Sequence, residues 1–296
     1  MSLEQQLLQY LVSGLTTGAI YALIALGFVA IHNVTGVINF AQGESAMLGA
    51  LLLVSLRGSL GLPLVPAFLL AVVLVALVGV AMHRLVIRPA RNASPITLII
   101  ITIGASIAIR GAALVIWGTD SYPLPAFSPG PPIRLGGAML RTQSLWVLGM
   151  MVASVLGLYL FFQRTLLGKA LRACAVNRLA ARLMGINQDH MATLSFALGG
   201  ALGGVAGAVI APITYATYDM GAMLGLKGFV AAIIGGLTSM PGAVAGGLLL
   251  GVLETAGAGL ISSGAKDAIA FGILLLVLLV RPSGLFGARQ DVRGGL

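Results

Sequence analysis

The sequence predicts an all-α integral membrane protein: a single transmembrane domain over residues 1–296 with about eight or nine membrane-spanning helices, some of them broken. Hydrophobic residues make up 58% of the chain and charged residues only 8%, and the mean hydropathy is +1.04. Uncharged apolar runs of about twenty residues, enough for one helix to cross a bilayer, recur along the whole length. Forty-one glycines offer small surfaces on which such helices can pack closely.

The first six crossings are apolar runs separated by polar or basic segments. The second is interrupted near its start by Asn39, Gln42 and Glu44, so we expect a broken or polar helix there. The fourth carries Arg110 inside it. In order, the expected spans are residues 7–31, 38–56, 63–82, 95–117, 145–163 and 191–218.

Residues 118–144, between the fourth and fifth crossings, form a polar loop that contains five prolines. Proline fixes φ and removes a backbone donor. We therefore expect this loop to be extended and irregular.

A basic loop at residues 164–190 joins the fifth and sixth crossings. Its cations are Arg164, Lys169, Arg172, Arg178 and Arg182. Two sets of apolar residues recur in it at the spacing i, i+4, i+7, so each set places an apolar face on a helix and turns the cations away. The sets are Leu167, Leu171 and Cys174, and Leu179, Leu183 and Ile186.

The second of these sets lies on a short helix predicted at residues 178–184. The side chain of Asn177 can cap its start, and Gly185 suits the left-handed residue that follows a helix end. A helix of about two turns is not stable alone in water. It must therefore dock on the membrane interface, on the rest of the fold or on another protein.

Small residues dominate the second half of the chain. The sixth crossing carries two adjacent rows of them, which let helix backbones approach closely. The rows are Gly199, Gly203 and Gly207, and Gly200, Gly204 and Ala208.

The stretch 228–265 is about twice as long as one crossing helix needs. We predict a helix break in it at Ser239, Pro241 and Gly242. A final span is expected to end at Val280.

The net charge of +9 would suit a nucleic-acid partner, but its distribution fits a membrane protein in a lipid bilayer better. With the N-terminus outside, eleven cations fall on the inside and five on the outside. This predicts a multi-pass membrane protein with the loop 164–190 and the C-terminus in the cytoplasm, and the loop 118–144 on the outside. The inside set adds Arg84, Arg88, Arg91, Arg281, Arg289 and Arg293 to the five cations above; the outside set is Arg57, Arg134, Arg141, Lys227 and Lys266.

Catalytic motifs are absent from the sequence. There is no G-x-x-x-x-G-K-[ST], H-E-x-x-H or G-x-S-x-G, so we expect no catalytic residue, no cofactor and no ATP hydrolysis by this chain. The single cysteine, Cys174, excludes an internal disulfide and is expected to be a small buried hydrophobe. The histidines, His32, His83 and His190, are too scattered to predict a metal site.

Glu44, Arg110 and Glu254 lie inside predicted crossings, where a charge costs on the order of a few kcal/mol or more. They line a translocation path, or they form a structural pair of Arg110 with Glu44 or Glu254 that fixes helix register. Asn39 and Gln42 join the path if a broken helix exposes amides to a small zwitterion. The alternative for them is a polar helix start near the interface.

LivH-type permease subunits of branched-chain amino acid ABC importers resemble this chain over nearly its whole length. The likeness rests on residues 16–44, which read T-T-G-A-I-Y-A-L-I-A-L-G-F-V-A-I-H-N-V-T-G-V-I-N-F-A-Q-G-E, and on residues 228–254, which read G-F-V-A-A-I-I-G-G-L-T-S-M-P-G-A-V-A-G-G-L-L-L-G-V-L-E. The resemblance implies a permease for branched-chain amino acids. Its partners would be a LivM-type second permease, two cytoplasmic ABC ATPase subunits and a periplasmic solute-binding protein.

The resemblance also implies a role for the helix at 178–184. Permeases of ABC importers carry an E-A-A-x-x-x-G element whose short helix seats in a cleft of the ATPase. Here Leu179 stands in place of the glutamate. The helix would transmit ATPase closure to the spans and present a basic outer face; the alternative is an interfacial helix that anchors the loop. The coupling residues would be Asn177, Arg178, Leu179, Ala180, Ala181, Arg182, Gly185 and Ile186.

Two further functions remain open from the sequence. Related permeases carry urea, short amides or other small polar solutes, and no residue here separates these cargoes. A stand-alone ion-coupled secondary transporter, a different class, would use Glu44 and Glu254 as proton or ion sites.

Overall fold

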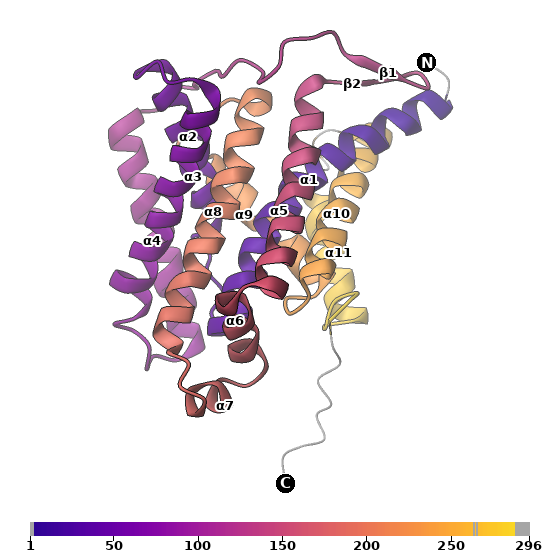
Figure 1. Cartoon of the computed structure of the whole chain (residues 1–296). Helices are drawn as coiled ribbons and strands as arrows, with labels where there is room; N and C mark the ends of the chain where they lie inside the picture. Colours follow the sequence, from indigo (N-terminus) through magenta and orange to yellow (C-terminus); the bar gives the residue numbers. More distant parts are fainter. Residues whose placement is uncertain (1–2, 263, 265, 288–296) are drawn as a thin grey trace.

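The computed structural model describes residues 3–262, 264 and 266–287. In this part of the chain the protein is a bundle of α helices with one short β-hairpin (Figure 1), so the predicted all-α membrane class is confirmed. The elements are α1 (Leu3–Thr35), α2 (Gln42–Gly58), α3 (Leu64–Ala81), the π-helical segment η1 (Met82–Ile87), α4 (Pro95–Trp117), β1 (Ile133–Leu135), β2 (Ala138–Leu140), α5 (Thr142–Arg164), α6 (Leu166–Val176), α7 (Arg178–Leu183), α8 (Gln188–Thr214), α9 (Met220–Gly235), α10 (Met240–Leu260) and α11 (Lys266–Val280).

Six of the described helices are long and apolar enough to cross a membrane: α1, α3 with η1, α4, α5, α8 and α10. The helices α2, α9 and α11 are shorter; α2 and α9 lie among the long helices, whereas α11 lies at the edge of the bundle beside α10 (Figure 1). The predicted number of eight or nine crossings requires that two or three of these shorter helices also cross the membrane, and it stays a prediction.

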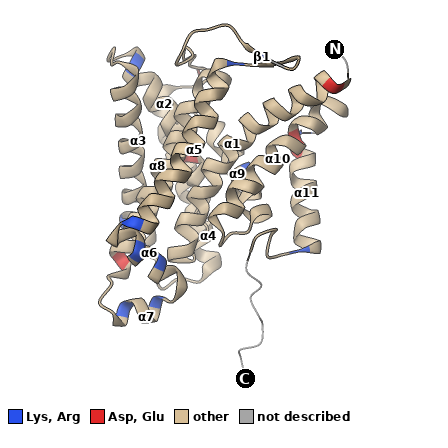
Figure 2. Cartoon of the chain, turned by 45° about the vertical axis from the view of Figure 1, so that its right-hand side comes forward, with Lys and Arg blue, Asp and Glu red and all other residues tan. Residues whose placement is uncertain are grey.

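The two ends of the bundle carry different segments. The hairpin and the start of α1 lie at one end, whereas α6, α7 and the end of α11 lie at the other (Figure 1). Lys and Arg residues gather around α6 and α7 (Figure 2). Arg289 and Arg293, which the charge argument counts at this end, lie outside the described residues.

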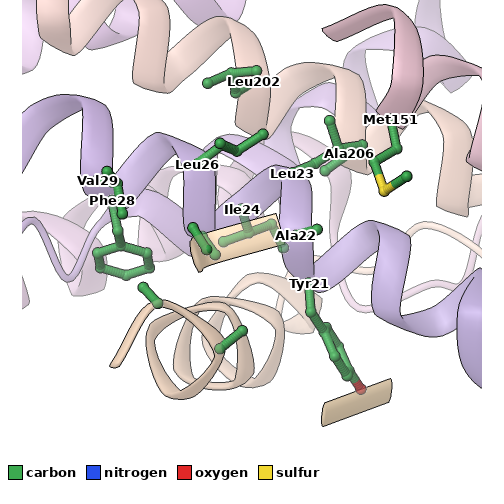
Figure 3. Packing of buried hydrophobic residues seen from close by; sticks show 14 of the residues in the cluster. Tyr21, Ala22, Leu23, Ile24, Leu26, Phe28, Val29, Met151, Leu202 and Ala206 are labelled. Atoms are coloured by element: carbon green, nitrogen blue, oxygen red, sulfur yellow. The ribbon is translucent and has the colours of Figure 1, made fainter. Parts of the chain in front are cut away.

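The core of the bundle is α1, which other helices enclose. Its residues 19–31 are almost all buried, and α10, α8, α9 and α5 pack around it. Figure 3 shows Leu23 and Leu26 of α1 close to Leu202 and Ala206 of α8. A helix that is apolar on every side must be covered on every side. For the central part of α1, other helices of the protein provide this cover.

The glycine rows of α8 pack against two different helices. A Cβ on Gly207 would collide with the backbone of Ala46 in α2, and one on Gly200 would press on the backbone of α3 at Val75. The predicted role of these rows in helix packing is therefore confirmed: α8 lies between α2 and α3, and Gly204 touches both of them.

The second crossing starts later than the sequence predicts. Residues 36–41 are not helical, and α2 begins only at Gln42. The chain turns away from α1 at Gly36, whose φ of +68° is a left-handed conformation that glycine adopts without strain. The predicted interruption near Asn39 thus separates α1 from α2.

The stretch 228–265 is broken as predicted, but the non-helical residues are 236–239, so Ser239 lies in the break whereas Pro241 and Gly242 lie in the first turn of α10. The hydroxyl of Ser239 accepts a hydrogen bond of 3.1 Å from the backbone N–H of Gly242, and Pro241 sits in the first turn. Gly236, with a φ of +102°, ends α9.

The proline-rich loop 118–144 is more regular than predicted. Its strands β1 and β2 pair antiparallel across Gly136 and Gly137, whose φ values are +55° and +98°. Two consecutive positive φ angles are the mark of a tight type I′ hairpin turn. The backbone N–H of Met139 donates a hydrogen bond of 2.7 Å to Gln9, which ties the hairpin to α1.

Replacing Gly207 with valine is expected to destabilise the bundle, because the new side chain meets the backbone of α2, which cannot move aside as a side chain can. We expect a loss of at least about 1–3 kcal/mol, the range of overpacked cores. The apparent melting temperature of the purified chain in detergent measures this loss. Gly104→Val in α4 is the matched control, since nothing lies within 4 Å of that position. Equal melting temperatures for the two variants would contradict the assigned contact.

Candidate translocation and coupling sites

The segment between α1 and α2 holds three buried polar side chains from the predicted translocation path. The Asn39 side chain accepts a hydrogen bond of 3.2 Å from the backbone N–H of Ala41. The Gln42 side chain donates one of 2.8 Å to the backbone carbonyl of Gly199 in α8. Asn39, Gln42 and Glu44 are each at most 5% exposed. They therefore lie inside the bundle.

Arg110 pairs with Glu44, one of the two partners that the sequence left open. Its Nη2 lies 2.9 Å from the Glu44 Oε1, and the Ser106 hydroxyl donates a hydrogen bond of 2.8 Å to the same oxygen. One turn before Ser106, the Thr102 hydroxyl accepts a hydrogen bond from the backbone N–H of Phe40 at 3.2 Å. A polar stripe on α4 thus attaches that otherwise outward-facing helix to the α1–α2 segment.

This polar cluster has unused hydrogen-bonding groups. Among the described residues, Glu44 Oε2, Gln42 Oε1 and Arg110 Nε have no hydrogen-bond partner. A cavity beside Asn39 and Gln42 has a volume of only about 10 Å³, room for one water molecule at most. The cluster can therefore bind a polar solute chemically, but in this conformation it has no space for one.

Glu254 belongs to a second, separate cluster. Its Oε1 lies 2.7 Å from Lys227 Nζ, and its Oε2 accepts a hydrogen bond of 2.9 Å from the Tyr21 hydroxyl in α1. Lys227 Nζ also lies 2.9 Å from Asp267 Oδ1 at the start of α11. Both oxygens of Glu254 are thus satisfied, which distinguishes it from Glu44.

The sequence predicts Lys227 in an outside loop, and this is wrong. Lys227 is buried inside α9, which extends upstream of the predicted start at residue 228. The extension is stabilised by close packing, because Gly225 of α9 meets Gly43 of α2 backbone to backbone. The signal that could have placed Lys227 is the glycine row around it, Gly221, Gly225 and Gly228, which marks a packed helix.

The short helix α7 has the predicted caps. The Asn177 side chain accepts a hydrogen bond of 3.0 Å from the backbone N–H of Ala180, and Gly185 has a φ of +82°. The backbone N–H of Ile186 reaches back to the carbonyl of Ala181 at 3.0 Å. These bonds satisfy both ends of a helix that is too short to be stable alone.

The outer face of α7 is predicted to be basic, but in the structure it is apolar, while the exposed Arg178 and Arg182 lie beside it. Leu179, Leu183 and Met184 are 68%, 80% and 82% exposed, whereas Ala181 is the residue that packs inward. Arg178 and Arg182 line a cavity on the inner side. Sequence spacing places the leucines on one face but cannot tell which face points outward. The small side chain of Ala181 allows close packing, and long arginine side chains reach into a solvated cavity.

In α6, Leu171 and Cys174 are buried as predicted, whereas Leu167 is half exposed. Burial raises the pKa of the Cys174 thiol. This is the state of an unreactive apolar cysteine, as the sequence predicts.

Over residues 10–279, the chain matches the family described as the permease component of the branched-chain amino acid transport system. The chain belongs to this permease family. It is 37% identical to the high-affinity branched-chain amino acid transport system permease protein BraD of Pseudomonas aeruginosa, and 34% identical to its counterpart LivH of Escherichia coli K12. In both comparisons 95% of each chain is covered.

Among solved structures, the chain resembles PsaBC from Streptococcus pneumoniae in complex with Fab, with a TM-score of 0.48 and 17% identity over 92% of this chain and 91% of that one. This likeness is too distant to add to the assignment. Membership of a permease family agrees with the lack of catalytic motifs, because the family transports and does not catalyse.

Replacing Lys227 with methionine is expected to destabilise this permease, because it leaves the Glu254 carboxylate buried without its cation. Breaking a buried pair in this way costs about 3–5 kcal/mol. Thermal unfolding in detergent, followed by circular dichroism, measures the loss. The double variant Lys227→Met/Glu254→Met removes both charges and should regain most of the stability. Asp267→Asn, at the exposed end of the network, is the mild control. A double variant no more stable than Lys227→Met would contradict the ion-pair account.

Proposed function

We propose that this chain is the permease subunit of an ABC importer that carries branched-chain amino acids across the inner membrane. The family match over residues 10–279 and the two relatives covered over 95% of their length support the cargo. The energy would come from two cytoplasmic ABC ATPase subunits. A LivM-type second permease and a periplasmic solute-binding protein complete the proposed assembly.

The single observation that carries the importer mechanism is the exposed apolar face of α7. This capped helix projects at one end of the bundle (Figure 1), with Leu179, Leu183 and Met184 facing outward. An apolar cleft of about 530 Å³ lies beside it, between α6 and α7. Exposed apolar patches of this kind are typical of protein interfaces. An ATPase subunit that covers the face would give α7 the support that two turns lack.

The charge distribution supports an orientation for this assembly. Basic residues gather at the α7 end (Figure 2), as in cytoplasmic loops. We propose that α7 and the C-terminus face the cytoplasm. The N-terminus and the hairpin loop would then face the periplasm, where the binding protein docks.

A contact between α7 and the α1–α2 segment offers a route for coupling. The Arg178 guanidinium lies so close to Gly36 that Nη2 would be 2.9 Å from a Cβ built there. Gly36 begins the segment that carries Asn39, Gln42 and Glu44, and Glu44 in turn pairs with Arg110. A displacement of α7 by the ATPase would therefore reach the buried polar cluster, and α4 through it.

We propose that Asn39, Gln42, Glu44 and Arg110 become part of the translocation path when the bundle opens. Gln42, Glu44 and Arg110 each have a buried atom without a hydrogen-bond partner, and a zwitterion can use these groups. Both carboxylate oxygens of Glu254 already have partners, which favours a structural role over a place in the translocation path. We propose that its pair with Lys227 fixes the register of α9 and α10.

Disrupting the outer face of α7 is expected to uncouple transport from ATP hydrolysis. The double variant Leu179→Ser/Leu183→Ser removes two exposed apolar side chains. If a partner buries them, each leucine side chain contributes about 1.5–3 kcal/mol to the free energy of association. The affinity for the ATPase subunits should therefore fall by at least about tenfold. Co-purification of the ATPase subunits and leucine uptake by the whole complex measure the two effects.

Bulky residues in place of Ala181 or Gly185 should uncouple uptake in the same way, because they displace α7 while the spans still insert. For the double leucine variant the matched control is Val115→Ser, which replaces an exposed apolar side chain at the far end of α4. Wild-type uptake by the α7 variants would refute the coupling role.

Radiolabelled leucine is expected to accumulate in liposomes that contain the complete complex, its binding protein and internal ATP, whereas urea is not. The permease alone should transport neither solute, and an ionophore should have no effect on the complex. Preferential urea uptake would assign the cargo to the short amides. Ionophore-sensitive transport by the isolated chain would replace the importer with a secondary transporter.

A further inference from the structure

A cavity of about 860 Å³ lies at the α7 end of the bundle, on the inner side of α7. The end of α1, the loop between η1 and α4, and the segment from α6 to the start of α8 enclose it. Four arginines line it from two segments far apart in sequence: Arg88 and Arg91 precede α4, and Arg178 and Arg182 belong to α7. The proposed coupling route shares Arg178 with this cavity but gives the cavity itself no role.

The charges around the cavity are not balanced. Asp189 is the one carboxylate among the described lining residues, and its Oδ2 is already 3.2 Å from the Nε of Arg88. Within the described part of the chain, no carboxylate pairs with Arg91, Arg178 or Arg182. Three unpaired guanidinium groups around one cavity repel each other, and an anion between them removes the repulsion. Arginine forks suit phosphate oxygens in particular.

Apolar residues around the cavity indicate the source of that anion. Val37, Ile87 and Leu98 form part of its wall. On the two elements beside them, Leu85 and Ile96 are 75% and 70% exposed, at the ends of two crossing helices. The ends of crossing helices lie at the depth of lipid head groups. A free anion would use the arginines alone, whereas a phospholipid also covers the apolar wall.

We propose that this cavity binds the phosphate of an anionic phospholipid, with its acyl chains along η1 and α4. Basic pockets between transmembrane helices are suited to such head groups. The bound phosphate joins Arg91 of the η1–α4 loop to Arg178 and Arg182 of α7. It thereby links the base of α4 to the coupling helix without any direct protein contact. An anionic lipid would then set the position from which α7 moves.

Native mass spectrometry of the full chain, extracted from bilayers of phosphatidylcholine and phosphatidylglycerol, tests this site. We expect the wild type to retain phosphatidylglycerol in preference to phosphatidylcholine. The variant Arg91→Gln should bind it about fivefold more weakly, since one cation near a lipid surface contributes about 1 kcal/mol. Arg91 is exposed and lies in a loop between helices, so its loss leaves the fold intact.

Arg84→Gln is the matched control, because Arg84 is an exposed cation of η1 that does not line the cavity. It should retain phosphatidylglycerol as the wild type does. Equal retention by Arg91→Gln and wild type would overturn the proposal, as would equal losses in Arg91→Gln and Arg84→Gln, which indicate diffuse surface charge.

Two further measurements distinguish other occupants of the cavity. Displacement of the lipid by inorganic phosphate at millimolar concentration would assign the cavity to a free anion. An ATPase subunit that binds the wild type but not Arg91→Gln, without any retained phosphatidylglycerol, would assign it to a protein partner. Either result overturns the lipid assignment.

Discussion

The non-helical residues 36–41 impose the constraint on which this bundle depends. Backbone that is buried without helical hydrogen bonds must find other partners in the protein. Here α4 supplies Thr102 to the backbone of Phe40, and Asn39 closes the turn at Ala41. Thr102 thereby fixes α4 against the segment, and Arg178 of α7 lies against Gly36 at its start. The break is therefore a point at which α1, α2, α4 and α7 meet.

The sequence predicts the features that depend on local chemistry and on helix length. Charge and hydropathy define the long spans, and the whole of α4 falls where its run of apolar residues does. The caps at Asn177 and Gly185 and the break at Ser239 follow from side-chain hydrogen bonds and from left-handed backbone that few other residues supply. The glycine rows of α8 follow because only small residues permit such contact.

What the sequence cannot give is the pairing of elements far apart along the chain. The sequence does not distinguish a lysine in a loop from a lysine buried in a helix beside a carboxylate. Lys227 is therefore predicted in a loop and is not identified from the sequence as the partner of Glu254. The periodicity of α7 fixes two faces without saying which one the bundle covers. The two clusters also differ in kind, since Glu254 has both oxygens bound and Glu44 keeps one free.

The enclosure of α1 has a consequence for how the chain is made. The ribosome delivers α1 to the translocon well before α10, which is its most extensive neighbour and lies far along the sequence. The nascent α1 must therefore wait, with its grooves at Gly14 and Gly18 empty, until α10 arrives to fill them. Pairing between elements far apart in sequence is intrinsically slow, and until it is complete the packing surfaces of the chain stay open to wrong partners.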